Sequence, residues 1–257
     1  MGAVTRLLKQ LIFLIIFGLF IGLVFWGLSR LGDSGPIVLN TPPPILPLET
    51  QDSQIISVGA DNDYDLLFRI RNPNVRLGAS RVAYEVDLLD DRGNLVDKLT
   101  GQTYILPGQF RFLLISPVRT EVAISQARIN FQVNRWQGFS ELIAPEDIAL
   151  VPTQGNFRRD HPSLFARYEG ILRNNSDFDL ATVDLIVLVR DSQNKIIATN
   201  RTNLQTVQAR SNRDFTFDWA EPFSGSIERI EIEAYTNLLE NDNFLKRYGS
   251  FENFQAF

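Results

Sequence analysis

The chain has 257 residues, with 25 Lys and Arg against 30 Asp and Glu, and therefore a formal net charge of −5. It contains no cysteine and one histidine, which excludes disulfide scaffolds, thiol nucleophiles, cysteine-based metal sites and most histidine-based catalysis. The acidic balance argues against a nucleic-acid partner, because a phosphate backbone requires a basic surface. A hydrophobic content of 44% with 21% charged residues indicates a folded chain.

Residues 11–28 form an uninterrupted apolar run, LIFLIIFGLFIGLVFWGL. As a helix, this run extends about 27 Å, close to the hydrocarbon thickness of about 30 Å. The run predicts an uncleaved anchor in the lipid bilayer, and a cleaved signal peptide or a buried soluble helix are the alternatives. Arg6 and Lys9 precede the run, and Arg30 follows it. The positive-inside rule therefore predicts a cell-membrane protein with a cytosolic N-terminus and with residues 31–257 outside the cytosol.

Prolines concentrate in the segment that follows the apolar run. Residues 31–50 contain Pro36, a Pro42-Pro43-Pro44 triplet and Pro47. Proline fixes φ and favours extended polyproline geometry. The segment is therefore predicted to be a semi-rigid stalk between the anchor and the folded part of the chain.

An internal repeat divides the rest of the chain. LLFRIRNPN at 66–74 is followed by VAYEVDLLDDRGNLV at 82–96, and YEGILRNNS at 168–176 is followed by VDLIVLVRDSQNKII at 183–197. The offset between the copies stays near 101–105 residues. Two units of about a hundred residues match the usual size of a domain.

Both copies show the pattern of short antiparallel strands. Apolar and polar residues alternate over 82–88, the period of a half-buried strand, and turn-forming residues at 91–94 and 191–194 end the strands. We therefore predict an all-β fold with two tandem immunoglobulin-like antiparallel β-sandwiches, preceded by one transmembrane helix. The predicted segments are a cytosolic tip and transmembrane helix at 1–30, a Pro-rich stalk at 31–50, a first β-sandwich at 51–152, a second β-sandwich at 153–237 and an aromatic tail at 238–257.

The two copies resemble known families of small β-sandwiches. The Asn-Pro-Asn motif at 72–74, followed by a V-x-Y-x-V-x-L strand, resembles the late embryogenesis abundant type 2 fold, also called the WHy domain. The second copy, with Asn174 and with Asp191 closing its strand, resembles the FxLYD domain, although it lacks the Asn-Pro-Asn form. The resemblance covers residues 60–135 and 164–235. It implies sandwiches that often follow one membrane helix, with no catalytic residue and with roles in stress protection, surface display or binding.

Asparagines follow the matching strand of each copy. Asn72 and Asn74 lie after the first such strand, and Asn174 lies after the second. The side chain of a strand-end asparagine bonds its own backbone two residues further on. We therefore predict that these asparagines hold turns in place.

Two groups of residues were considered as possible metal or catalytic sites. The D-x-D-x-D pattern at 61–65 begins like a calcium loop, but its sixth position is Leu66 and its twelfth is Asn72, so the calcium-loop pattern fails and a solvated strand-entry loop is expected. His161 lies in a polar stretch and is expected to be an exposed linker residue. No nucleophile motif accompanies it. The sequence therefore predicts no enzyme, no cofactor and no metal site.

One predicted strand of the second copy is apolar on both faces. Over 183–190, Ile186 and Leu188 occupy the second face, where the matching strand of the first copy has Glu85 and Asp87. A large apolar sheet face requires a cover. Two kinds of cover are possible for this face. It could be covered by the chain's own tail or linker, or it could contact the first domain or a partner.

The C-terminal segment is rich in aromatic residues. Phe244, Tyr248 and Phe251 follow the spacing of one helix face. The segment is expected either to dock on its own sandwich or to bind another subunit through aromatic anchors. The candidate interface residues of the chain are Ile186, Leu188, Phe244, Tyr248, Phe251, Phe254 and Phe257.

The favoured function is that of a non-enzymatic, single-pass surface or envelope protein that binds or scaffolds other proteins through its sandwich modules. Its partners would be the lipid bilayer, through residues 11–28, and a protein of the envelope. A homo-oligomer remains open, because Gly18 and Gly22 have the small-xxx-small spacing of packed membrane helices. The alternatives are a stress-protection protein at the membrane and, less favoured, a hydrolase of envelope polymers that uses paired carboxylates.

Overall fold

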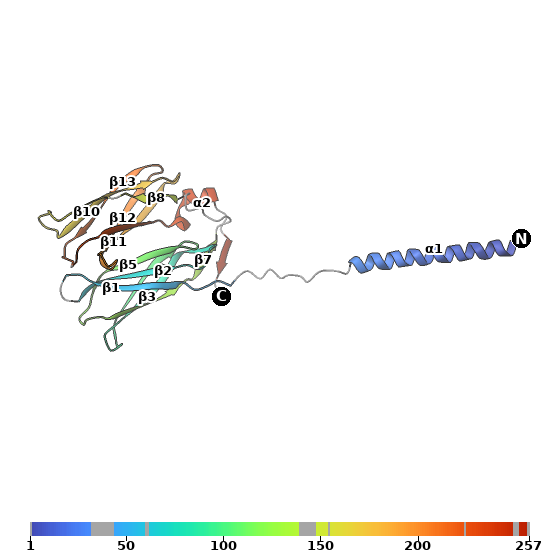
Figure 1. Cartoon of the computed structure of the whole chain (residues 1–257), viewed down its shortest axis with the longest axis horizontal. Helices are drawn as coiled ribbons and strands as arrows, with labels where there is room; N and C mark the ends of the chain where they lie inside the picture. Colours follow the sequence, from blue (N-terminus) through green and yellow to red (C-terminus); the bar gives the residue numbers. More distant parts are fainter. Residues whose placement is uncertain are drawn as a thin grey trace. The chain divides into compact units, whose positions relative to one another are not determined.

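The computed structural model describes residues 2–31, 44–59, 62–138, 148–153, 155–223, 225–248 and 252–255. The chain forms two compact units, which meet in the sequence between Pro44 and Ile45. The first unit contains helix α1 (Gly2–Leu31), and the second contains the strands (Figure 1).

Helix α1 covers the apolar run. Large apolar side chains from Ile12 to Trp26 are exposed on it. In the part of the chain that the structure describes, no helix has both the length and the hydropathy of a membrane span. The membrane anchor stays a prediction.

The first β-sandwich consists of two antiparallel sheets. One sheet has the order β1-β2-β5, with β1 (Glu49–Ser57), β2 (Asp63–Arg71) and β5 (Phe110–Arg119). The other has the order β15-β7-β3-β4, with β6 paired to β3, and contains β3 (Leu77–Leu89), β4 (Leu95–Ile105), β6 (Gln126–Gln132), β7 (Arg135–Gly138) and β15 (Glu252–Gln255). Val82, Val86 and Leu88 of β3 point inward with the period of two expected from the sequence, and they form a core with Phe68 and Ile70 of β2.

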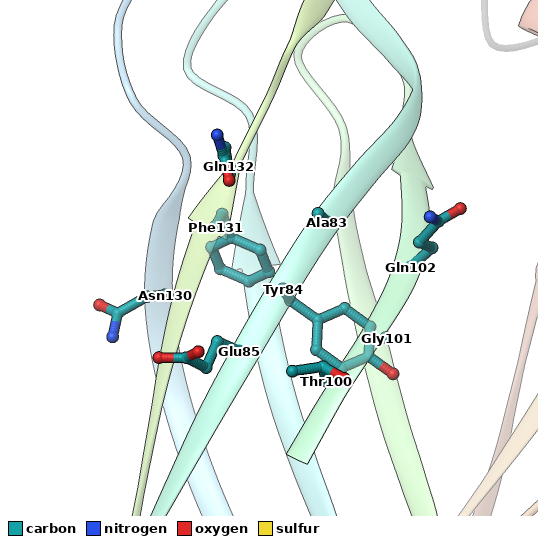
Figure 2. A pocket seen from close by; sticks show the side chains of 9 residues that line it. All are labelled: Ala83, Tyr84, Glu85, Thr100, Gly101, Gln102, Asn130, Phe131 and Gln132. Atoms are coloured by element: carbon teal, nitrogen blue, oxygen red, sulfur yellow. The ribbon is translucent and has the colours of Figure 1, made fainter. Parts of the chain in front are cut away.

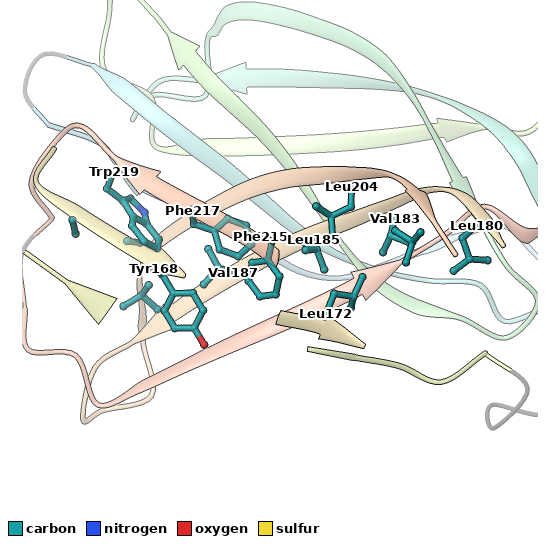
Figure 3. Close-up of a cluster of buried hydrophobic side chains, with 14 of the residues drawn as sticks. Tyr168, Leu172, Leu180, Val183, Leu185, Val187, Leu204, Phe215, Phe217 and Trp219 are labelled. Atoms are coloured by element: carbon teal, nitrogen blue, oxygen red, sulfur yellow. The ribbon is translucent and has the colours of Figure 1, made fainter. Parts of the chain in front are cut away.

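The second β-sandwich repeats this plan. One sheet contains β8 (Leu150–Pro152), β9 (Asn156–Arg158), β10 (Ala166–Asn174) and β13 (Asn212–Trp219). The other has the order β12-β11-β14, with β11 (Leu180–Arg190), β12 (Ile196–Val207) and β14 (Arg229–Tyr235). Val183, Leu185 and Val187 of β11 pack against Phe215 and Phe217 of β13 (Figure 3). The predicted all-β class with antiparallel β-sandwiches is confirmed.

The boundaries of the modules differ from the predicted ones. Leu150–Pro152 was expected to end the first sandwich, but it forms β8 and pairs with β10 of the second. The segment at 238–257, which was expected to be one tail, contributes to both sandwiches. Its 3₁₀ helix η2 (Leu238–Glu240) and helix α2 (Asp242–Tyr248) contribute buried side chains to the core of the second sandwich, whereas β15 pairs with the first. Strands of three or four residues are too short for a periodic pattern to assign them to a sheet.

The two strand-end asparagines have equivalent roles. Asn72 is fully buried, and its Nδ2 donates to the carbonyl oxygens of Leu77 and Leu106 at 2.6 and 2.9 Å. Asn174 is 1% exposed, and its Nδ2 donates to the carbonyl oxygens of Phe178 and Gln208 at 2.8 and 2.9 Å. The Oδ1 of each accepts the backbone N–H two residues further on, at 3.0 Å for Asn72 and 3.1 Å for Asn174. Each amide therefore joins three backbone segments, which confirms the predicted structural role.

Replacing Asn174 by alanine is expected to destabilise the second sandwich by about 2–4 kcal/mol, because it leaves the buried carbonyl of Phe178 and the buried N–H of Ser176 without partners and removes the bond to Gln208. The measurement is the urea-unfolding midpoint of the full chain in detergent. Asn175→Ala removes the neighbouring side chain, which is exposed, and should change the free energy of unfolding by less than about 0.5 kcal/mol. Equal effects of the two substitutions would contradict the assigned role.

Candidate functional site

The second apolar face of β11 packs against the first sandwich. Ile186 and Leu188 are buried there and contact a cluster that includes Leu67 of β2 and Leu114 of β5. Of the alternatives drawn from the sequence, the first domain is therefore the cover of this face. A sequence signal for the contact exists, since Leu66-Leu67-Phe68 is apolar on both faces of its strand. Ile186 and Leu188 are correspondingly not exposed to a partner.

A carboxylate is buried at this interface. Asp65 of β2 is 7% exposed, and the Thr199 hydroxyl of β12 donates to its Oδ2 at 3.0 Å. Burial raises the pKa of the Asp65 carboxyl, although hydrogen bonds from Ser116 and Thr199 and the charge of Arg201 act in the opposite direction. The expected solvated loop at 61–65 is therefore wrong for Asp65. Asp63 pairs instead with Arg119 at 3.1 Å, and Asp61 lies outside the described residues.

A buried cation also joins the two sandwiches. Arg111 of β5 is 5% exposed and lies over the ring of Tyr104 at 4.1 Å and that of Tyr235 at 4.8 Å. Its Nη1 donates to the Tyr104 carbonyl at 2.9 Å, while the backbone N–H of Phe112 donates to the Tyr235 hydroxyl at 3.0 Å. Burial raises the pKa of both tyrosine hydroxyls. Because Tyr235 belongs to β14 of the second sandwich, these contacts fix one sandwich against the other.

Two of the predicted aromatic anchors dock on their own sandwich. Phe244 of α2 is fully buried, with its ring centroid 5.1 Å from that of Phe178. The ring of Tyr248 lies 4.8 Å from Phe244 and 5.9 Å from Phe178. The docking alternative therefore holds for Phe244 and Tyr248. The reason is the apolar end of the second core, which α2 covers.

The remaining tail residues lie further along the chain. The backbone of Phe254 is part of β15 and is paired opposite Trp136 of β7. The side chain of Phe254, and all of Phe251 and Phe257, lie outside the described residues. Their role as interface residues stays a prediction.

The outer face of the first sandwich carries a polar trough. Its first hollow, of about 520 Å³, lies over β4, β3 and β6 (Figure 2). In the strand register, Ala83 lies between Gln102 and Gln132, and the next row places Glu85 between Thr100 and Asn130. The small side chain of Ala83 leaves space between the two longer glutamines. A Cβ at Gly101 of β4 would collide with Tyr84, so glycine at this position lets the Tyr84 ring lie beneath the trough.

The side-chain amides of this trough have no hydrogen-bond partner in the described chain, whereas its carboxylates lie in ion pairs. Among the described residues, the side chains of Gln102, Asn130 and Gln132 make no hydrogen bond with another residue. Glu85, in contrast, accepts from Lys98 at 2.6 Å, and Asp87 lies 3.2 Å from the same Nζ. The trough therefore offers neutral groups that both donate and accept hydrogen bonds.

A second hollow of about 480 Å³ shares Ala83 and Gln102 with the first. It is bounded by Arg81 of β3 and by Glu240 of η2, whose side chains lie 3.5 Å apart. The Oε1 of Gln137 is buried at this hollow and has no hydrogen-bond partner in the described chain. Since η2 packs against the second sandwich, both modules shape the trough. Sequence reasoning missed this site, because isolated amides leave no periodic or motif signal.

The lone histidine lies away from these features. His161 is half-buried in the segment between β9 and β10, and its Nδ1 accepts from the backbone N–H of Ser163 at 3.2 Å. This is a local turn contact. The expectation of an exposed residue is therefore only partly met.

Comparisons with known proteins give no identification. No protein-family model matches the chain, and no curated protein matches it. Among solved structures, the chain is similar to a transglutaminase from red sea bream (8% identity, 75% of this chain, 29% of that chain, TM-score 0.22). It is also similar to the C-terminal globular domain of an oligosaccharyltransferase from Pyrococcus abyssi (10% identity, 82% of this chain, 48% of that chain, TM-score 0.19). A promiscuous carbohydrate-binding module of the β-sandwich superfamily gives 9% identity over 74% of this chain and 97% of that chain, with a TM-score of 0.15. These similarities are too weak to support a functional conclusion.

The Asp65 carboxyl generates a prediction about pH. Because its pKa is raised in the folded chain, the folded state holds the proton more tightly than the unfolded state, and ionisation of Asp65 costs stability as the pH rises above the acidic range. Asp65→Asn is therefore expected to raise the urea-unfolding midpoint at pH 7. The gain should shrink as the pH is lowered through the range near 4 in which carboxyls bind protons.

The matched control for this experiment is Asp63→Asn, which lies on the same strand and removes an exposed ion pair with Arg119. Its effect at pH 7 should be small, because exposed ion pairs contribute about 0–1 kcal/mol. A loss of stability in Asp65→Asn at pH 7 would show that the charge of Asp65 is needed beside Arg201, and would contradict the prediction.

Proposed function

We propose that this chain is a non-enzymatic, membrane-anchored surface or envelope protein that binds a partner protein outside the cytosol. The observation that carries the proposal is the polar trough over β4, β3 and β6, in which three neutral amides have no partner of their own in the described chain. All three residues are exposed, so water hydrates these amides in the free chain, and a ligand with matching donors and acceptors can replace that water. The two sandwiches, in this proposal, serve as one rigid support for the trough.

The chemistry of the trough favours a polypeptide as ligand. A primary amide both donates and accepts, which matches the N–H and C=O groups of a peptide main chain. Lys98 pairs with both Glu85 and Asp87, and one ammonium group against two carboxylates leaves a negative balance, which disfavours an anion such as phosphate. An extended segment of a partner protein satisfies these groups without requiring charge of its own.

The rigidity of the support follows from the buried interface between the sandwiches. Leu188 and Leu114 belong to one apolar cluster, and Arg111 lies over aromatic rings from both modules. Glu240 reaches the trough from the side of the second sandwich. Binding sites held by rigid elements lose little conformational entropy when they take up a ligand.

The anchor and the family belong to the same proposal. The apolar run at 11–28 supports a membrane helix with the N-terminus in the cytosol. The matching ties made by Asn72 and Asn174 support a common origin of the two sandwiches. They fit immunoglobulin-like modules related to the late embryogenesis abundant type 2 and FxLYD domains.

The test uses the full-length tagged chain, purified in mild detergent from its own host. A photo-cross-linking residue at Ala83 should capture a companion protein in the trough. The double substitution Gln102→Ala/Gln132→Ala should weaken binding of that companion by about tenfold, since each hydrogen bond contributes about 0.5–1.5 kcal/mol.

The matched control is Gln193→Ala, which removes an exposed glutamine in a turn of the second sandwich. It should leave both the cross-link and the affinity unchanged. A companion that binds the double variant as tightly as the original chain would contradict the trough as the binding site. The unfolding midpoints of all variants should agree, because neither trough glutamine has a hydrogen-bond partner to lose in the described chain.

A further inference from the structure

We propose that the end of the first sandwich at which the chain enters it docks on the surface of a lipid bilayer that carries anionic headgroups. Five side chains form this surface, which we call the entry surface: Leu46, Arg71, Val75, Arg76 and Phe110. The inference rests on the proposed function in one respect, since it takes up the membrane anchor of that proposal. It does not involve the trough.

Hydrogen bonds hold three separate segments together at this end of the sandwich. The backbone N–H of Leu46 donates to Asn74 Oδ1 at 2.8 Å, and Asn74 Nδ2 donates to the Leu46 carbonyl at 2.7 Å. The backbone N–H of Gly108 donates to the Asn74 carbonyl at 2.9 Å. These contacts join the segments at 45–49, 71–76 and 106–110.

The apolar side chains of the joined segments face solvent. Leu46, Val75 and Phe110 are 47%, 65% and 48% exposed. In the second sandwich, the residue that follows the equivalent asparagine tie is Asp177, which pairs with Arg210 at 2.8 Å, and helix α2 covers that end of the core. The described residues give the entry surface no such cover. Apolar side chains that are grouped and exposed in this way mark a site of interaction with a protein or a membrane.

Positive charge accompanies these apolar side chains. The three segments contain Arg71 and Arg76 and a single acid, Glu49. Glu49 lies 3.6 Å from Arg71, whereas Arg76 is exposed and has no ion-pair partner among the described residues. The Arg71 guanidinium also lies over the ring of Phe110, at 5.3 Å from its centroid. Arginine beside exposed apolar groups is the composition of segments that lie at the boundary between headgroups and acyl chains.

The path of the chain identifies the bilayer as the occupant of this surface. Residues 32–45 separate the end of α1 from Leu46, and they extend at most about 50 Å. Because Leu46 itself belongs to the entry surface, an anchor in the bilayer attaches the sandwich by this end. Attachment over such a distance gives a high effective concentration of the surface beside the lipid, so a weak affinity is sufficient for docking.

The experiment uses the full chain in vesicles of phosphatidylcholine, or of phosphatidylcholine mixed with phosphatidylglycerol. The chain has no cysteine, so Val75→Cys accepts a single NBD fluorophore, and quenching by doxyl-labelled lipid reports contact with the bilayer. The matched control is Val122→Cys, because Val122 is also exposed but follows β5 at the other end of the sandwich. In the mixed vesicles, quenching at position 75 should be at least about twofold stronger than at position 122.

A second substitution tests the contribution of charge. Arg76→Gln, combined with the probe at position 75, should lower the ratio of docked to free chain about fivefold in the mixed vesicles, the contribution of one arginine near an anionic surface. Added salt should act in the same direction, because it screens this attraction. Arg92→Gln removes an exposed arginine from the turn between β3 and β4, and it should leave the ratio unchanged.

Flotation of the vesicles distinguishes failure of docking from failure of the anchor. A chain that floats with both lipid mixtures, and whose two probes are quenched equally, would overturn the docking and leave the anchor in place. A chain that floats only with the mixed vesicles, with stronger quenching at position 75, would support the docking and contradict the anchor. A chain that floats with neither would overturn both. Equal quenching at position 75 in the two lipid mixtures would also overturn the proposal, because it excludes recognition of anionic headgroups.

Discussion

The arrangement of the whole β-rich unit depends on one buried contact, in which the outer face of β11 meets the outer face of β2 and β5. Leu188 and Leu67 are both buried there, although each strand also contributes to the core of its own sandwich. A sheet that is apolar on both faces must be covered on both. The two sandwiches therefore pack together as one compact unit. This packing places η2 beside the first sandwich, where it bounds the trough.

Charged groups inside this contact restrict how the two modules fit together. Arg111 and Asp65 each find partners from both sandwiches or at their boundary, namely the Tyr104 and Tyr235 rings and the Thr199 hydroxyl. An apolar surface alone would tolerate a shift of one sheet over the other. A shift that removed these partners would leave buried polar groups unsatisfied, at a cost of about 1–3 kcal/mol for each group. The apolar area supplies the affinity between the modules, and the polar groups favour one register.

The sequence predicts local features of this fold well and non-local ones poorly. The repeat, the period-two strands and the asparagine ties follow from neighbouring residues, and so does the short helix that carries Phe244 and Tyr248. The sequence does not identify the cover of Ile186 and Leu188, because the pattern of one strand carries no information about what lies opposite its outer face. The trough was missed for a related reason. Gln102, Ala83 and Gln132 come together through strand register, and nothing in their separate positions indicates this.

The C-terminal segment shows how the interface controls more distant features. Tyr248 ends the helix docked on the second sandwich, and Glu252 begins the strand paired with the first. The chain between these two residues spans at most about 14 Å when fully extended. Strand β15 therefore reaches β7 only while the two sandwiches stay close together. A loosening of the contact around Leu188 that moved the two sandwiches apart would therefore separate β15 from β7.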